Sequence, residues 1–367
     1  MNMDHRIYQI ALSQINGLSC RSCRQLLELG ISPEEVFSMS HSGLKQIFGN
    51  HDKIVGSIES KQPLEFAKKE LEFVEKYNIK VLFHTDAEYP KRLNRPECMD
   101  TPVVLFMKGD CDLNKKHVLS FVGTRRATDA GRKTTRTLIE QLGGDDTLIV
   151  SGLAYGIDSE SHQAALDNQK ATVGVLGHGL DQIYPPQNRN LAKAMVGNGG
   201  LLTEYPSETR LNPRLFPARN RIIAALSDAT IVVEAAEKGG ALITAAIANS
   251  YQREVFAVPG RLTDKYAAGC NNLIADNKAL IIRNAKDIFY HLGWPLENET
   301  GVQTSLFPDL TKDEQTIYRC LEQNDGITLD EITEKCDFSL PKIAAITLNL
   351  ELKGIIRCLP GKKYVIC

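Results

Sequence analysis

Short apolar runs alternate with amphipathic stretches between residues 76 and 292. Strand candidates lie at residues 80–84, 103–109, 118–123, 148–152, 172–177, 201–205, 230–234 and 255–260. The amphipathic stretches lie at residues 157–168, 190–197, 217–227 and 241–252. Continuous apolar strands separated by helices are typical of a parallel sheet covered on both faces. The pattern predicts an α/β fold, an extended Rossmann-like parallel sheet, to which the first two strands are an extension.

Residues 1–75 have a different pattern, in which apolar positions recur at helical spacing between short turns. The stretch ISPEEVFSMS predicts a helix start, with Ser32 as the N-cap and Pro33 at the first helical position. The segment is typical of a small all-helical domain of the helix–hairpin–helix or SAM-like type. Its turn at Asn16-Gly17 either presents backbone N–H groups to a phosphate or forms a plain corner between helices, and the sequence leaves both open.

The end of the chain contains a linker and a third domain. Residues 293–305 are polar and indicate a linker, and residues 306–367 follow with three helical patterns and a strand pair. Three helices followed by a β-hairpin are the plan of a winged-helix domain. Its third helix carries Lys342 and Lys353 but few other long polar side chains, so we expect it to contact protein rather than to read a DNA sequence.

The composition is that of an ordinary globular protein. Of the 367 residues, 43% are hydrophobic and 24% are charged, and the formal net charge is −2. This total neither favours nor excludes nucleic acid, because a local basic face is what binds phosphate. No apolar run is long enough to cross a bilayer, and the N-terminus lacks the features of a signal peptide. We therefore expect a cytoplasmic protein without membrane contact.

The nine cysteines are odd in number and mostly scattered, which indicates reduced thiols rather than a disulfide framework. The close pair is Cys20 and Cys23. A lone CxxC is either redox-active or half of a zinc site in other proteins, but no second pair with matching spacing occurs. We therefore expect two ordinary helix residues and no bound metal.

Glycine-containing loops follow the predicted strands. In open α/β sheets ligands bind beyond the carboxyl ends of the strands, so we expect these loops to meet. Glycines bring backbone N–H groups close to a ligand, and helix N-termini follow directly, a combination that suits phosphate. Neither the P-loop pattern nor the dinucleotide fingerprint occurs. The candidate binding residues in these loops are Gly123, Thr124, Ser151, Gly152, Gly239 and Gly240.

Arginines and an aromatic residue accompany the loops. Arg125 and Arg126 follow one strand, and a second group lies near or within the stretch FPARNRIIAALSD. Arginine on phosphates, with bases stacked on an aromatic ring, holds single-stranded nucleic acid without sequence preference. The alternatives are structural, since arginines also cap carbonyls or pair with carboxylates, and a lone phenylalanine is usually core. The candidates of the second group are Arg189, Arg214, Phe216, Arg219, Asn220 and Arg221.

Catalytic chemistry finds little support in the sequence. His162 lies one helical turn after Asp158. That spacing suits an acid–base pair, but a helix-start carboxylate that bonds a neighbour is more common. Ser151 does not stand in a G-x-S-x-G elbow, and clustered metal ligands are absent from the sequence. We therefore expect a binding protein rather than an enzyme, with no cofactor.

The same stretches resemble a known family. FVGTRRAT, SGLAYGIDSESHQAAL and FPARNRIIAALSD are similar to motifs of the DprA/Smf (DNA-processing protein A) family, and GVLGHGLDQIYPPQNRNL, EAAEKGGALITAAIA and VFAVPG match in order and spacing. The resemblance spans the predicted sheet domain and extends more loosely to its flanks. It implies a recombination mediator that binds and protects incoming single-stranded DNA in natural transformation, loads the RecA recombinase, and forms homodimers through the Rossmann domain.

The family's DNA-contacting residues fall on particular positions of this sequence. The arginine after VGS or VGT falls on Arg125, and the strand-end serine and glycine fall on Ser151 and Gly152. The aromatic before RNR, which stacks on a base in some members, falls on Phe216. The resemblance thus implies the same groove that the residue types indicate.

Two positions depart from the family pattern. Some members have a DNA-binding lysine directly after the YP turn, where this chain has Pro186, with Arg189 three residues on. Some have a lysine in GLAKGID, where this chain has Tyr155. The strength of DNA binding and the path of the strand are open at these positions.

Two other classes of protein remain as alternatives. Phosphoribohydrolases of the lonely-guy type share a related Rossmann fold and use a PGGxGTxxE loop, whose glutamate assists cleavage of a nucleoside monophosphate. The corresponding residues 238–246 have alanine where that glutamate would stand, which favours a binding protein. A winged-helix transcription regulator is disfavoured, because the sheet loops carry most of the unusual residues.

Overall fold

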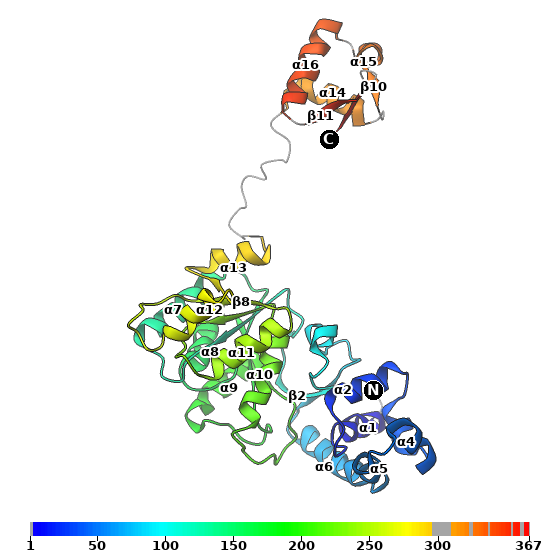
Figure 1. Ribbon diagram of the computed structural model, residues 1–367, viewed down its shortest axis with the longest axis vertical. Coiled ribbons are helices and arrows are strands. Elements are labelled where there is room, and N and C mark those ends of the chain that lie inside the picture. The colour runs from blue at the N-terminus through cyan, green and yellow to red at the C-terminus, as the bar shows by residue number, and fades with distance from the viewer. Residues whose placement is uncertain are drawn as a thin grey trace. The chain divides into compact units, whose positions relative to one another are not determined.

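The chain folds into two compact units that divide after residue 295 (Figure 1). The computed structural model describes residues 3–295, 310–322, 326–336, 338–353, 355–359 and 363–366. Most of the predicted linker, residues 296–305, lies outside the described residues.

The chain begins with the predicted helical region. Its helices are α1 (Met3–Ser13), α2 (Cys20–Glu28), α3 (Pro33–Ser38), α4 (His41–Phe48), α5 (Asp52–Glu59) and α6 (Gln62–Lys76). At α3 the Ser32 Oγ accepts a hydrogen bond from the Glu35 N–H at 3.2 Å, and Glu35 Oε2 accepts one from the Ser32 N–H at 2.7 Å. This reciprocal capping confirms the predicted N-cap.

A nine-stranded sheet forms the centre of the first unit, in the order β1-β2-β6-β5-β4-β3-β7-β8-β9. Its strands are β1 (Lys80–Phe83), β2 (Val104–Gly109), β3 (His117–Val122), β4 (Thr147–Ser151), β5 (Ala171–Val175), β6 (Gly199–Thr203), β7 (Ala229–Val232), β8 (Glu254–Ala257) and β9 (Leu280–Ile281). The pattern of apolar runs anticipated every strand except β9, which is two residues long and exposed.

The strands from β3 to β9 pair in parallel, as predicted, whereas the extension does not. β1 pairs antiparallel with β2, and β2 pairs antiparallel with β6. The described segment between β1 and β2 contains no α-helix, so these two strands lack the helical crossover that usually joins parallel neighbours.

Alternate residues of the central strands enter separate cores on the two faces of the sheet. On β3, Val118 and Val122 belong to one core, and Leu119 and Phe121 belong to the other. The first core also takes apolar residues of α10 and α11, and the second takes those of α7, α8 and α13. The remaining helices of this unit are α7 (Asp129–Gln141), α8 (Ile157–Asp167), α9 (Arg189–Gly197), α10 (Leu215–Leu226), α11 (Gly240–Ser250), α12 (Ala268–Ala275) and α13 (Ala285–Leu292).

The helical region and the sheet edge share one core. Ile10, Val36 and Ile58 of the helices cluster with Phe83 of β1 and Phe106 of β2. A buried arginine, Arg24 of α2, donates hydrogen bonds to the Thr101 carbonyl oxygen at 3.1 Å and to its hydroxyl at 2.8 Å. The helices therefore cover the antiparallel extension rather than standing apart from it.

The second unit has the predicted winged-helix plan. Its elements are α14 (Lys312–Glu322), β10 (Ile327–Thr328), α15 (Leu329–Lys335), α16 (Leu340–Leu352), β11 (Ile356–Leu359) and β12 (Lys363–Ile366). The strand β12 pairs antiparallel with both β10 and β11. The sequence pattern did not indicate β10, which has two residues. The core of the second unit contains the buried residues Ile317, Ile332, Ile343 and Leu350.

Candidate functional site

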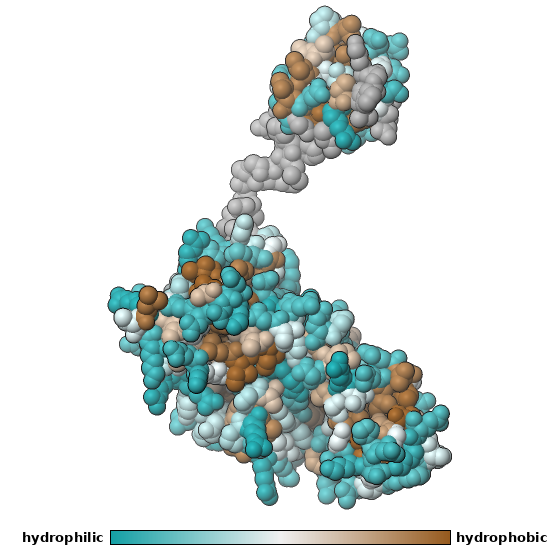
Figure 2. Space-filling view, viewed as in Figure 1, coloured by the Kyte–Doolittle hydropathy of each residue, from teal (hydrophilic) through white to brown (hydrophobic). Residues whose placement is uncertain are grey.

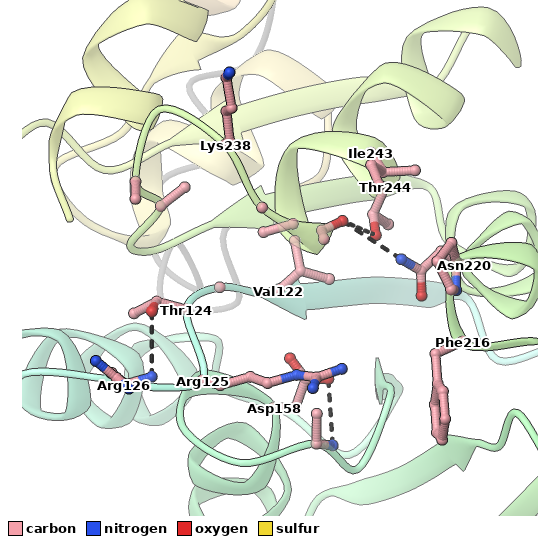
Figure 3. Close-up of a pocket in the computed structure, with 18 of the residues that line it drawn as sticks. Val122, Thr124, Arg125, Arg126, Asp158, Phe216, Asn220, Lys238, Ile243 and Thr244 are labelled. Carbon is pink, nitrogen blue, oxygen red and sulfur yellow. Dashed lines mark hydrogen bonds between the residues drawn. The ribbon is translucent and has the colours of Figure 1, made fainter. Parts of the chain in front are cut away.

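A cleft of about 510 Å³ opens at the carboxyl end of β3. Its lining comes from the loop from β3 to α7, the loop from β4 to α8, the first turns of α10, the loop from β7 into α11 and the loop after β8 (Figure 3). Parallel strands end at the same edge of a sheet, so segments far apart in sequence meet there, as the sequence predicts. Of the predicted residues, this cleft brings together Gly123, Thr124, Arg125, Arg126, Phe216, Arg219, Asn220, Gly239 and Gly240.

The loop after β3 presents the open cations of the cleft. Arg125 and Arg126 are both exposed. The Thr124 N–H donates to the Glu234 carbonyl oxygen at 2.7 Å, and the Arg126 N–H donates to Thr124 Oγ1 at 3.2 Å. These bonds tie the loop to the end of β7, so the backbone is fixed and the guanidinium groups are left to a ligand.

The opposite side of the cleft is the start of α11. Gly239 precedes the helix, and Gly240 is its first residue. A Cβ atom at either glycine would meet nothing within 4 Å, and Gly239 has φ 171°, which is extended backbone open to any residue. The fold therefore does not require glycine at these two positions. They leave the free N–H groups of a helix N-terminus, with the side chain of Lys238 beside them, accessible to an anion.

Phe216 and Asn220 share one face of α10 and line the cleft. The Phe216 ring is half-buried and lies 5.6 Å from the Tyr184 ring, centroid to centroid, at 46°. Asn220 Nδ2 donates to the Gly240 carbonyl oxygen at 3.4 Å. Phe216 therefore lies at the edge of the cleft and not in the core. Figure 3 shows its ring across the cleft from the α11 side, with Arg125 on the same side as Asp158.

Arg219 forms the floor of the cleft and is 4% exposed. Its Nη1 donates to the Gly152 carbonyl oxygen at 2.8 Å and also to the Val175 carbonyl oxygen. Burial lowers the pKa of Arg219 to about 10, so the guanidinium remains charged at neutral pH. Burial raises the pKa of Asp158, and the Arg219 charge opposes that rise. Arg219 thus serves as an internal brace.

Ser151 and Gly152 lie in the interior beneath the cleft. Ser151 is fully buried, and its Oγ donates to the Phe121 carbonyl oxygen at 2.6 Å. A Cβ at Gly152 would lie 2.6 Å from the Arg219 guanidinium and 2.7 Å from Asp158 Oδ2. The structure therefore gives both residues packing roles that support the loop after β4.

Three further predicted arginines lie outside the described lining of the cleft. Arg221 makes a two-pronged ion pair with Glu204 at 2.5 and 2.6 Å and donates to the Asp100 carbonyl oxygen at 2.9 Å. Arg189 is exposed at the start of α9, and Arg214 is exposed just before α10. Arg221 therefore connects α10 to neighbouring segments.

Lys265 and Tyr266 line the cleft but were absent from the sequence-based set. They belong to the loop after β8, with the Lys265 Nζ 6.0 Å from the Tyr266 ring centroid. The sequence could have indicated these two residues, because their loop follows the parallel strand β8 and therefore begins at the same edge of the sheet as the other loops of the cleft. In the described chain, no carboxylate forms an ion pair with Arg125, Arg126, Lys238 or Lys265.

Other candidate chemistry is not assembled. His162 is fully buried, with Nδ1 2.7 Å from Thr172 Oγ1, and burial lowers its pKa to about 3. Asp158 Oδ2 instead accepts from the Gly152 N–H at 3.2 Å. Cys20 and Cys23 are free, and burial raises the pKa of both thiols. Among the described residues there is no group of three potential metal ligands and no helix able to span a membrane.

Comparison with known proteins identifies the family of this chain. A family model of DNA recombination-mediator protein A matches residues 80–293, and one of the DprA winged helix domain matches residues 304–362. The chain belongs to the DprA/Smf family. Protein Smf from Synechocystis sp. is 33% identical over 403 residues, covering 99% of both chains. DNA processing protein DprA from Bacillus subtilis is 45% identical over 53% of this chain and 65% of its own length.

Solved structures of DprA proteins share the fold. The crystal structure of DprA from Streptococcus pneumoniae superposes with a TM-score of 0.67 at 33% identity, covering 77% of this chain and 97% of that chain. DprA from Helicobacter pylori gives a TM-score of 0.52 at 31% identity, covering 58% of this chain and 95% of that one. The latter work concerns the single-stranded DNA binding mode of the Helicobacter protein.

Proposed function

We propose that this protein binds single-stranded DNA with little base preference and acts as a cytoplasmic recombination mediator. In this role it protects incoming DNA and loads the RecA recombinase onto it during natural transformation. The observation that carries the binding function is the composition of the cleft. Unpaired cations, an aromatic ring and open glycines at a helix start line one cavity. A single strand offers the matching groups, phosphates and unpaired base faces.

The same cleft supports a preference for single strands over duplex. A base stacks on Phe216 only if its face is free, and in a duplex both faces are covered by neighbouring bases. The cations alone would attract either form, because phosphate contacts carry no information on strandedness.

A nucleotide-processing enzyme of the lonely-guy phosphoribohydrolase type is the rival function, and the carboxylates near the cleft argue against it. The Asp158 carboxylate accepts backbone N–H groups and faces Arg219. Glu234 accepts a hydrogen bond from the Thr128 N–H at 3.0 Å. Both are occupied by the protein, which supports a binding role without catalysis. Release of free base from nucleoside monophosphates by the purified protein would overturn this part of the proposal.

The RecA partner and a homodimer through the sheet domain are proposed from the family. The winged-helix unit supports protein contact rather than DNA contact, because the two lysines at its third helix, Lys342 and Lys353, already pair with carboxylates. Lys342 Nζ lies 2.7 Å from Asp313, and Lys353 Nζ lies 2.7 Å from Glu314. Light scattering of the full chain, with and without purified RecA, measures both associations. A monomer at all concentrations would exclude the homodimer.

The decisive experiment measures binding of labelled oligo(dT) and of duplex DNA over a range of salt. Arg125→Ala should weaken binding of the single strand and lower the slope of log K against log salt by about 0.7, the loss of one phosphate contact. Phe216→Ala should reduce affinity by about 1–3 kcal/mol with the slope nearly unchanged, and Phe216→Tyr should retain the affinity. Lys286→Ala, at an exposed cation of α13, is the matched charge control. Unchanged binding in both cleft variants would refute the proposed site.

A further inference from the structure

A second hollow of about 760 Å³ lies beside the cleft, against the outer face of α11. Its apolar part consists of Leu242, Ile243, Ala246 and Ile247, which recur at the spacing of one helix face. We call these four residues the α11 shelf. Ile243 is 43% exposed. Figure 2 shows hydrophobic side chains gathered on the surface over α11.

The exposed half of the shelf, Ile243 and Ala246, has no role in the core, whereas Leu242 and Ile247 are partly buried and pack against the core on one side. The core side of α11 is formed by other residues, among them Ala241, Ala245 and Ala248, which are buried against the sheet. A surface helix normally carries polar residues on its outer face. Only the last turn of α11 follows this rule, with exposed Asn249 and Ser250. The first turns are apolar on both sides, and the fold does not account for the exposed Ile243 and Ala246.

The shelf and the cleft form one groove. Lys238, Gly239, Gly240 and Ile243 line both hollows. A Cβ at either glycine would project into empty space, so the absence of side chains keeps the junction between the hollows open. In Figure 3, Ile243 and Lys238 stand on the α11 side of the cleft, opposite Phe216.

We propose that the α11 shelf is a second base-binding subsite for the strand held in the cleft. A phosphate of that strand passes Lys238 and the open glycines, and the next nucleobase packs on Ile243 and its neighbours. This inference rests on the proposed single-stranded DNA function and deepens it. The strand then runs from the cations of the cleft, across the start of α11, and along its outer face.

The chemistry of the shelf selects bases rather than phosphates. Its rim contains one cation, Lys238, and one carboxylate, Glu237, which repels phosphate. The flat apolar face of a nucleobase packs well against aliphatic side chains. A folded protein partner fits less well, because four side chains on two turns of one helix are far less than a stable protein interface requires.

Direct contact is testable with a fluorescent side chain at the shelf. The chain has one tryptophan, Trp294, which stacks on His117 at 4.0 Å between centroids, and it provides the background signal. In the full-length Ile243→Trp variant, saturating oligo(dT) should quench the introduced tryptophan, whereas the wild-type signal should stay constant. Bound DNA without quenching would overturn the subsite.

Affinity provides the second measurement. Ile243→Ser should weaken binding of long oligo(dT) roughly fivefold, the lower limit for loss of one stacked base, without changing the salt slope. Oligonucleotides too short to reach past the cleft should bind the variant as they bind the wild type. Leu29→Ser, at a residue 76% exposed on the helical region, is the matched control. Equal affinity of Ile243→Ser and wild type at every length would overturn the subsite.

The outcomes distinguish failure of the base-binding subsite from failure of the proposed single-stranded DNA function. If wild-type protein fails to bind oligo(dT), or if Arg125→Ala has no effect, the proposed function fails. If binding depends on Arg125 but both shelf measurements are negative, only the subsite fails. A fluorescence change that depends on protein concentration without DNA would assign the shelf to contact between copies, which also overturns the subsite.

Discussion

Two pairs of arginines at one edge of the sheet have opposite surroundings. Arg125 and Arg126 are exposed and have no carboxylate partner among the described residues. Arg219 and Arg221 are held by carbonyl oxygens and by Glu204. The first pair forms a surface that a ligand can neutralise, and the second fixes the backbone around it. Residue type alone does not separate a binding arginine from a bracing one.

Position on the element explains the difference. Arg219 is followed at helical spacing by Ile222, Ile223 and Leu226, all fully buried or nearly so. It therefore stands on the core face of α10. Arg125 and Arg126 precede α7 on a loop, where no helix face directs them inward.

The largest expected effect comes from removing the brace. Arg219→Ala leaves a buried carboxylate and two carbonyl groups without their cation, so we expect the free energy of unfolding to fall by about 3–5 kcal/mol. Urea denaturation measures this loss. Removing both charges in Arg219→Met with Asp158→Asn should destabilise less than Arg219→Ala alone. If Arg219→Ala were as stable as the wild type, Arg219 would not have the structural role that distinguishes it from Arg125.

A pH effect should follow from His162, whose pKa is lowered from 6.5 to about 3 by burial and by the charge of Arg219. Below pH 6.5 the unfolded chain binds a proton at this residue that the folded protein does not. Its contribution to stability is therefore complete above pH 6.5 and falls by about 1.4 kcal/mol per pH unit as the pH drops toward 3.

Urea denaturation between pH 7.5 and 5 tests this assignment. His162→Gln should reduce the dependence of stability on pH, because glutamine does not titrate in this range. An identical pH dependence in wild type and His162→Gln would contradict the expectation.

Gly156, which lies outside the cleft lining, and Gly240, which lies within it, should differ in the same way as the two pairs of arginines. Gly156 has φ +81°, and a Cβ there would clash with the Thr124 carbonyl oxygen, so Gly156→Ala should reduce stability by about 1–3 kcal/mol. Gly240→Ala should leave stability equal or slightly higher, because alanine favours a helix, yet weaken DNA binding at the junction. Thermal unfolding and oligo(dT) titration measure the two effects. A Gly240→Ala variant with normal affinity would show that the open space is not used.

The smallest expected effect is that of Lys238→Ala. The loss of one exposed cation should lower the salt slope by about 0.7 without changing thermal stability. Lys69→Ala, at an exposed lysine of α6, is the control. Equal slopes for both variants would remove Lys238 from the path of the strand.

Much of the fold was predictable, because the spacing of apolar residues along the chain indicates directly which positions are buried. The continuous apolar runs at β3, β4 and β5 are buried at every position, and the Ser32 cap follows from local chemistry. The antiparallel direction of β1 and β2 was not predictable, because the apolar pattern of a strand does not encode its direction. The two-residue strands β9 and β10 are too short to produce a pattern.

The sequence predicted the location of the binding site better than it predicted the role of each residue in it. The loops after the strands do meet, and Phe216, Asn220 and the open glycines do line the cleft. Ser151 and Gly152 also lie at strand ends, but both have packing roles. The Ser151 hydroxyl donates to the Phe121 carbonyl oxygen, and the absence of a side chain at Gly152 leaves room for the Arg219 guanidinium. Lys265 and Tyr266 were missed because their loop continues beyond its Pro259-Gly260 turn before it returns to the cleft.

The shared core of the helices and the sheet edge sets a limit on how this chain can be divided. The family match begins at residue 80, but a fragment that begins there would expose Phe83 and Phe106, which the helices cover. An apolar sheet face laid open in this way invites aggregation. A shortened protein intended for crystallisation or for single-molecule work should therefore begin at the N-terminal helices and be trimmed from the winged-helix end.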